Sequence, residues 1–190
     1  MAAGRGSRAG GETPKPVLVL AGRPLGEWAL EAARASGAHP VVLVVGHQGP
    51  RVRRVAPEGV MIVEARSWRR GLAHSLRAGL RALDGWFEVT AVCVGLADQP
   101  LVGADAYRRL VAAHAEGAAL AVATYDGVRG NPVLIARSLW PEAMALEGDE
   151  GGRVLMRNHP VVEVDCSGTG SPFDVDTLDD LAAIQEAFGR

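Results

Sequence analysis

Cysteine and aromatic residues are scarce in this chain, and each scarcity excludes a class of protein. Only two of its 190 residues are cysteine, Cys93 and Cys166, and they form no CxxC pair. Neither a disulfide framework nor a structural zinc site is therefore expected, and a reducing compartment fits. Aromatic residues make up 5% of the chain and the formal net charge is -2. Both values argue against a surface that binds nucleic acid.

Long hydrophobic runs are also missing. The longest apolar stretches have the length of a strand, well short of the ~20 residues that span a bilayer. The first 15 residues include Arg5 and Arg8 but no apolar segment of the kind that a signal peptide needs. We therefore expect a soluble cytoplasmic protein with neither a nucleic-acid nor a membrane partner.

What the sequence does contain is an alternation of apolar strands and amphipathic helices. Strands are expected at 17–22, 40–46, 60–65, 89–98, 119–127, 131–138 and 161–165, and helices at 27–38, 71–83, 105–117 and 177–189. The strands are apolar throughout, which is typical of a sheet covered by helices on both faces. The prediction is one domain over residues 1–190, a three-layer, doubly wound, mostly parallel α/β sheet of the Rossmann-like type. Such sheets bind ligands at the carboxyl ends of their strands.

A glycine-rich segment, AAGRGSRAGGETPK, lies close to the start of the chain. Loops that bind phosphate use glycines to bring backbone N–H groups close to the ligand, and cations to neutralise its charge. The segment contains both kinds of residue: Gly4, Gly6, Gly10, Gly11, Arg5, Arg8 and Lys15. It matches neither GxGxxG after a strand nor GxxxxGK[ST]. By composition alone, a glycine-rich basic tail is the favoured alternative.

Acidic residues follow two of the extended segments. Asp98 comes just after the strand VTAVCVG, where a carboxylate could hold Mg²⁺ or could equally cap a turn. Asp174 and Asp176 alternate along an extended stretch, so they point to opposite sides and only one can readily face a given site. Asp176 or Thr177 could instead be the N-cap of the last helix.

Three further segments offer polar groups. WRRGLAHSL places Gly71 and Ser75 at a helix start, where Ser75 could bind a ligand or simply be solvated. GNPV, which contains Asn131, and GDEGGR, which contains Asp149 and Arg153, are turn sequences. Their side chains could contact a substrate or belong to polar loops.

Taken in order, these segments resemble one family. AAGRGSRAGG…PK, SW..G..HSL..GL, LADQPL, GNPVL, GDEGGR and DVDTLDDL are similar to motifs of the MobA-like nucleotidyltransferases, and most similar to those of the molybdenum cofactor cytidylyltransferases. The resemblance extends from Ala2 to about Leu181. It departs from the family at Ala9, Ala97 and Leu178, where the family has Met, Gly and Pro, and in extra residues before Lys15. None of these changes removes a charged group that the chemistry needs.

The resemblance implies transfer of NMP from an NTP to a phosphorylated acceptor, with release of pyrophosphate. CTP is implied because AAG at 2–4 is similar to the cytidylyl branch, and molybdenum-bound molybdopterin is implied as the acceptor. The implied roles are nucleotide binding by Ala3, Gly4, Arg5, Gly6, Ser7, Arg8, Lys15, Gly71 and Ser75; catalysis by Arg8, Lys15 and Asp98; Mg²⁺ binding by Asp98 and Asp176; and acceptor contact by Asn131, Asp149 and Arg153. The alternatives are an NAD(P)H-dependent oxidoreductase of the nicotine blue type and a non-catalytic nucleotide-binding remnant.

The family's strand before AAG has no counterpart in this sequence. In a doubly wound sheet the strand that feeds the phosphate loop is central, so its absence leaves two neighbouring strands with unpaired backbone groups. We expect that the start codon is assigned too late. The central slot should then be empty, or filled by VLVL at 17–20, which would pull Lys15 away from the site.

Overall fold

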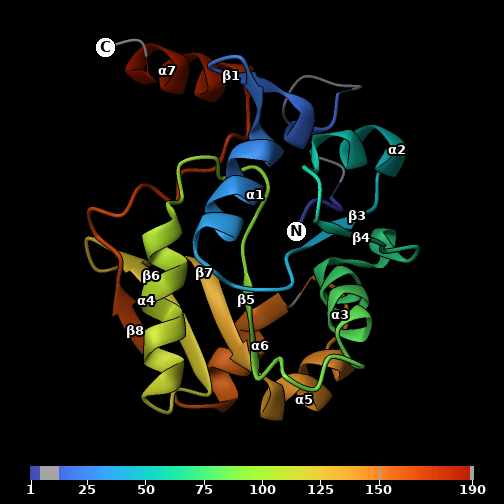
Figure 1. Ribbon diagram of the computed structural model, residues 1–190, viewed down its shortest axis with the longest axis vertical. Helices are drawn as coiled ribbons and strands as arrows, with labels where there is room; N and C mark the ends of the chain where they lie inside the picture. The colour runs from blue at the N-terminus through green and yellow to red at the C-terminus, as the bar shows by residue number, and fades with distance from the viewer. Residues whose placement is uncertain (5–12, 150, 189–190) are drawn as a thin grey trace.

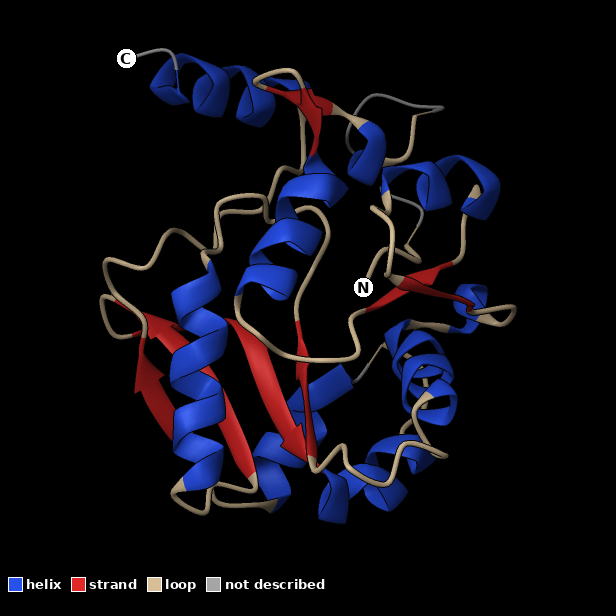
Figure 2. Cartoon of the chain, in the orientation of Figure 1, coloured by secondary structure: helices blue, strands red, loops and turns tan. Residues whose placement is uncertain are grey.

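The computed structural model describes residues 1–4, 13–149 and 151–188 (Figure 1). The predicted loop residues Arg5, Gly6, Ser7 and Arg8 lie outside the described residues. The predicted fold class is confirmed: helices cover a sheet rich in parallel strands from both sides (Figure 2). Within the described residues, no helix is long and apolar enough to cross a membrane.

The main strands form two blocks. The first block is a parallel pair, β3 (Val42–Val45) and β4 (Met61–Glu64). The second has the order β5-β7-β6-β8, comprising β5 (Ala91–Val94), β7 (Val128–Ala136), β6 (Leu120–Tyr125) and β8 (Val162–Asp165). Strand β8 runs parallel to β6, whereas β7 runs antiparallel to both of its neighbours. The sheet is therefore mixed at β7.

Helices pack on both faces of these strands (Figure 1). One face carries α1 (Leu25–Ala35) and α4 (Ala104–Ala115), and the other carries α3 (Leu72–Ala82), α5 (Trp140–Ala145) and α6 (Gly151–Asn158). Two further helices lie at the periphery, α2 (Gly49–Val52) and α7 (Leu178–Phe188). Among the described residues, single-turn 3-10 helices lie at Lys15–Val17, Arg53–Val55, Trp68–Arg70 and Arg137–Leu139.

Strand β6 shows why the central strands are apolar throughout. All its residues are buried, and successive side chains enter different cores. Leu120 packs in the cluster that contains α3, α5 and α6, whereas Ala121 packs in the cluster that contains α4. A strand with buried faces on both sides needs no polar residue at alternate positions, as the sequence predicted.

The segment VLVL does not lie in the sheet, so that alternative is wrong. Its last two residues form β1 (Val19–Leu20), which pairs with β2 (Arg23–Pro24) in a hairpin beside α7 (Figure 1). Leu20 is fully buried in a cluster with Leu25, Val175 and Ile184. This packing fixes the hairpin at the periphery and leaves Lys15 near the sheet.

Met1–Ala3 lie between β3 and β5. The Met1 ammonium donates a hydrogen bond to the Gly95 carbonyl oxygen (2.7 Å), and the Ala2 N–H donates to the Val44 carbonyl oxygen (2.9 Å). Beyond Met1, an apolar cavity of about 160 Å³ continues between the two strands, and we call it the β3–β5 slot.

Candidate active site

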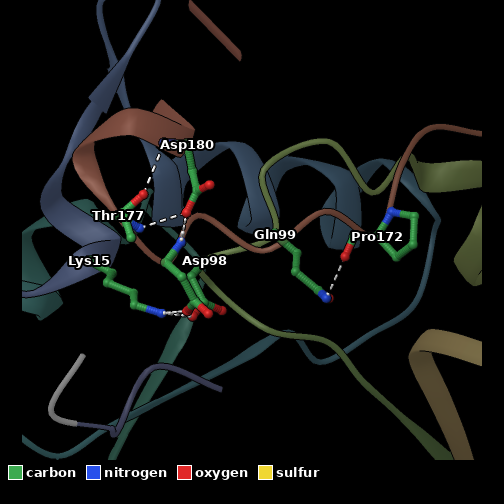
Figure 3. Close-up of polar contacts among 7 residues, drawn as sticks. Lys15, Asp98, Gln99, Pro172, Thr177 and Asp180 are labelled. Carbon is green, nitrogen blue, oxygen red and sulfur yellow. Dashed lines mark hydrogen bonds and ion pairs between the residues drawn. The ribbon is translucent and has the colours of Figure 1, made fainter. Parts of the chain in front are cut away.

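Two acidic residues meet at the carboxyl edge of the sheet. Asp98 follows β5, and Asp176 precedes α7, yet a backbone hydrogen bond from the Val175 N–H to the Asp98 carbonyl oxygen (2.9 Å) holds the two segments together. Figure 3 shows the Lys15 side chain directed at Asp98. Its Nζ is 3.0 Å from Asp98 Oδ2 and also bonds Asp176 Oδ1. Residues far apart in sequence thus form a single charged cluster.

The Lys15 ammonium is held by charge as well as by geometry. Its side chain is only 11% exposed. Burial lowers the pKa of the amine, but the hydrogen bond to Asp176 and the charge of Asp98 more than offset this, so the pKa is raised overall. Lys15 therefore carries a full positive charge between the two carboxylates at neutral pH.

The turn before α7 uses Thr177 as its cap. Thr177 Oγ1 accepts a hydrogen bond from the Asp180 N–H (3.1 Å), and Asp180 Oδ2 accepts one from the Thr177 N–H (2.7 Å) (Figure 3). This reciprocal arrangement is a capping box. Of the two caps that the sequence allowed, Thr177 is the one used, and the Asp176 side chain turns to Lys15.

Asp174 lies on the same segment but does not bond Lys15. Buried Val175 separates it from Asp176, as expected for alternate positions of an extended chain. Asp174 is still close to the cluster, because partial burial and the charges of Asp98 and Asp176 raise its pKa.

A cleft of about 380 Å³ opens beside the cluster. Seven predicted site residues line it: Ala3, Gly4, Lys15, Gly71, Ser75, Asp98 and Asp149. Ser75 is 3% exposed, so the solvated alternative is wrong. Two residues that were not predicted from the sequence, Trp68 and Arg69, also line the cleft. They stack, with the Arg69 guanidinium 4.6 Å from the Trp68 ring centre. The basic segment RSWRR at 66–70, which contains both residues, is the sequence feature that could have pointed to them.

Gly71 and Asp149 join two walls of the cleft. The Leu72 N–H donates to Asp149 Oδ1 (3.1 Å), and the Ala73 N–H donates to the Gly148 carbonyl oxygen (3.0 Å). The 148–149 turn therefore satisfies open N–H groups at the start of α3. This close approach requires a glycine at 71, whose φ is +113° and where an added Cβ would lie 2.2 Å from the Gly148 oxygen.

We expect Gly71→Ala to lower the free energy of unfolding by about 3 kcal/mol or more, since backbone strain alone costs about 1–3 kcal/mol and the Cβ also collides with Gly148. Urea unfolding would measure it. Gly37→Ala is the matched control, because its φ of +85° is similar but an added Cβ meets nothing within 4 Å. Equal losses in the two variants would contradict the close-approach argument.

Two predicted acceptor residues do not line the cleft. Asn131 lies in β7, where its carbonyl oxygen accepts a hydrogen bond from the Tyr125 hydroxyl (2.9 Å). Arg153 lies on the exposed side of α6. Of the three residues predicted to contact the acceptor, only Asp149 borders the cleft.

The pair of carboxylates suits a hard divalent cation. Oxygens of Asp98 and Asp176 already bond a single positive group, the Lys15 ammonium, so they are close enough to share a cation. In the described part of the chain, no group of three or more His, Cys, Asp or Glu side chains could hold a metal. Two carboxylates are the number that Mg²⁺ commonly uses when water and phosphate oxygens complete its shell.

Comparison with known proteins adds to this geometry. The profile of the MobA-like NTP transferase domain matches residues 1–164, most of the chain. The chain belongs to the MobA-like NTP transferase family. The predicted resemblance is therefore confirmed at the level of the family, which supports nucleotidyl transfer as the general activity.

The chain is similar to two known proteins whose names describe different functions. The chain is 34% identical over 192 residues to nicotine blue oxidoreductase of Paenarthrobacter nicotinovorans, covering 95% of this chain and 92% of the relative. It is 37% identical over 157 residues to the bifunctional protein GlmU of Pelobacter propionicus. That match covers 82% of this chain but only 32% of GlmU.

A solved structure has the same fold over nearly the whole chain. Rv0371c of Mycobacterium tuberculosis superposes with a TM-score of 0.83 at 30% identity, covering 97% of this chain and 94% of the other. A second structure of Rv0371c, in complex with manganese, superposes with a TM-score of 0.77 at 30% identity, covering 94% and 95% of the two chains. A similar protein has thus been crystallised with a divalent metal.

Proposed function

We propose that this protein transfers NMP from an NTP, with CTP favoured, to a phosphorylated acceptor of the molybdopterin type, releasing pyrophosphate. The observation that carries the proposal is the Lys15–Asp98–Asp176 cluster, which borders a cleft of about 380 Å³. Nucleotidyl transfer needs positive charge at the phosphates and a fixed geometry more than it needs acid–base groups. A phosphate monoester acceptor is already an anion near neutral pH, so no general base is required.

Each group of the cluster has a role in this reaction. Asp98 and Asp176 would hold Mg²⁺, which when bound supplies charge neutralisation and polarises the α-phosphorus. Lys15, which lines the cleft, would bind phosphate oxygens and offset charge on the leaving pyrophosphate. The backbone at Ala3 and Gly4, and the loop residues Arg5, Gly6, Ser7 and Arg8, would cradle the triphosphate.

The identities of the base and the acceptor rest on the resemblance in the sequence. AAG at 2–4 favours CTP, and Gly71 and Ser75 match positions near the base. Asp149, which borders the cleft, and Asn131 and Arg153, which do not line it, are the proposed acceptor contacts.

The oxidoreductase alternative has one specific support, the similarity of nicotine blue oxidoreductase over 95% of this chain. The same cleft could hold the pyrophosphate of a dinucleotide. The carboxylate pair favours nucleotidyl transfer instead, because a diphosphate that is not cleaved has no developing charge for a metal to stabilise. A binding remnant would retain the cleft but turn nothing over.

The deciding experiment compares two activities of the same preparation. We expect pyrophosphate release from Mg-CTP in the presence of molybdenum-loaded molybdopterin, dependent on the divalent metal and greater than with ATP, GTP or UTP. Oxidation of NADPH with a quinonoid dye is the matched assay for the alternative. NADPH oxidation without pyrophosphate release from any NTP would overturn the proposal. Binding of CTP without turnover would favour the remnant.

A further inference from the structure

Two segments that carry the acidic residues of the cluster lie side by side: 98–102, which follows β5, and 170–176, which leads into α7. Backbone contacts join them at both ends: an antiparallel bridge between Val102 and Gly170, a hydrogen bond from the Ser171 N–H to the Leu101 oxygen (3.0 Å), and one from the Val175 N–H to the Asp98 oxygen (2.9 Å). The separation of the Asp98 and Asp176 carboxylates therefore depends on how firmly these two segments are held together.

Pro172 interrupts the contacts between the two segments, because proline has no N–H to donate. In the described part of the chain, no backbone hydrogen bond joins residues 172–174 to the 98–102 segment. The side chain of Gln99 supplies a bond at this point instead. Its Nε2 donates to the Pro172 carbonyl oxygen (2.8 Å), as Figure 3 shows. Since Gln99 directly follows Asp98, this bond acts on the neighbour of a proposed metal ligand.

The same amide also reaches Asp174. Burial and the charges of Asp98 and Asp176 raise the pKa of the Asp174 carboxyl, and a hydrogen bond from Gln99 acts in the opposite direction. Gln99 thus contacts the 170–176 segment at Pro172 and at Asp174, within the stretch that lacks backbone bonds to 98–102. The next acidic residue, Asp176, bonds Lys15.

Gln99 is buried in a way that stability alone does not favour. Only 3% of the residue is exposed, although glutamine is usually a surface residue. Its Oε1 is buried and has no hydrogen-bond partner among the described residues. A buried acceptor without a partner lowers stability, and an apolar side chain of similar size would avoid that cost. What glutamine adds at this position is the N–H group that bonds Pro172.

We propose that Gln99 is a positioning residue, which holds the 170–176 segment against the 98–102 segment and so sets the separation of the Asp98 and Asp176 carboxylates. The inference rests on the proposed role of these carboxylates as metal ligands. Gln99 does not line the cleft, so it acts through Asp98 and not on the nucleotide. Residues that hydrogen-bond around metal ligands typically change metal affinity by about 10–100-fold.

Gln99→Met tests this role, because it removes both the N–H donor and the unpaired oxygen while keeping a long unbranched side chain. We expect binding of Mn²⁺ alone, followed by electron paramagnetic resonance, to weaken by about 10-fold or more. Hydrogen exchange at the Val175 amide should quicken by about 10-fold. Exchange at Val122, in the buried strand β6, and the urea midpoint should stay close to those of the wild type.

The rate of pyrophosphate release separates positioning from chemistry. Both carboxylates remain in Gln99→Met, so the rate at saturating metal should stay close to that of the wild type, while the metal concentration that gives half of it should rise. Gln185→Met is the matched control. Gln185 Oε1 accepts a hydrogen bond from the Ala21 N–H (2.8 Å), so the same substitution removes a side-chain bond to the backbone away from the 98–102 segment. Its affinity for Mn²⁺ should be unchanged.

Unaltered Mn²⁺ affinity in Gln99→Met would overturn the proposal. Equal losses in Gln99→Met and Gln185→Met, or a lower urea midpoint with faster exchange at Val122 as well, would also overturn it, because the effect would then be a general loosening of the fold. A lower rate at saturating metal with unaltered affinity would do the same. Failure of the proposed function gives a different result: no NTP releases pyrophosphate, while the differences in Mn²⁺ affinity and in Val175 exchange remain.

Discussion

Asp98→Asn and Asp176→Asn should each lower metal-dependent turnover by about 10³-fold or more. Cation binding by the carboxylates is expected to supply several kcal/mol of transition-state stabilisation, and each 1.36 kcal/mol is a factor of ten. The fold should persist in both variants. The hydrogen bond from the Val175 N–H to the Asp98 oxygen uses the backbone, and Lys15 retains one carboxylate in each case. Initial rates of pyrophosphate release, with urea unfolding alongside, would measure both effects.

Asp174→Asn is the matched control for this pair. Asp174 lies two residues from Asp176 and shares its electrostatic surroundings, but no bond joins it to Lys15 among the described contacts. Its replacement should change turnover only a few-fold, through the local charge. Near-normal metal-dependent rates in both Asp98→Asn and Asp176→Asn would refute the assigned metal site. An equal loss in Asp174→Asn would show that the rate depends on total charge and not on two specific ligands.

The fold class was predictable because its signal is repeated along the chain. A continuous apolar run such as VVLVV at 41–45 is typical of a strand in a sheet that helices cover on both faces. Strand β6 confirms this pattern, because all of its residues are buried. The direction of each strand was harder to predict from the sequence. Only two residues, Asp126 and Gly127, separate β6 from β7, and this tight connection makes the pair antiparallel within an otherwise parallel pattern.

The short helices α2, α5 and α6 escaped prediction for a related reason. Each has eight residues or fewer, too few turns for a periodic stripe to appear. Packing stabilises them instead. Trp140 and Ala143 of α5, for example, are buried against α3 and β7.

The candidate site was predictable in composition but not in its contacts. Lys15, Asp98 and Asp176 were named from the sequence, yet each acid kept an alternative role as a cap, which for Asp176 was the stronger reading. Contacts between side chains decide which of these alternative roles Asp176 takes. Thr177 and Asp180 cap α7 between themselves, and only then is the Asp176 carboxylate available to Lys15. No local sequence pattern determines which of two neighbouring polar residues caps the start of a helix.

Lys15→Met should affect metal and nucleotide in opposite directions. The Lys15 ammonium lies between the two carboxylates that are proposed to hold the metal, so it competes with any cation for them. Its removal should tighten binding of Mn²⁺ alone by about 10-fold or more, since two unit charges 4 Å apart interact by about 4 kcal/mol at an effective dielectric constant of 20. The same change should weaken CTP binding and lower turnover by about 10²-fold, because a phosphate contact is lost.

Manganese binding followed by electron paramagnetic resonance, and CTP binding followed by calorimetry, would separate the two effects. Lys15→Arg should restore CTP affinity only in part, because a planar guanidinium does not reproduce a compact ammonium. Arg69→Met is the matched control: Arg69 lines the same cleft but stacks on Trp68, and its loss should leave affinity for Mn²⁺ nearly unchanged. Unaltered Mn²⁺ affinity in Lys15→Met would refute the competition. Unaltered CTP affinity would remove Lys15 from the nucleotide site, even if Asp98 and Asp176 hold the metal.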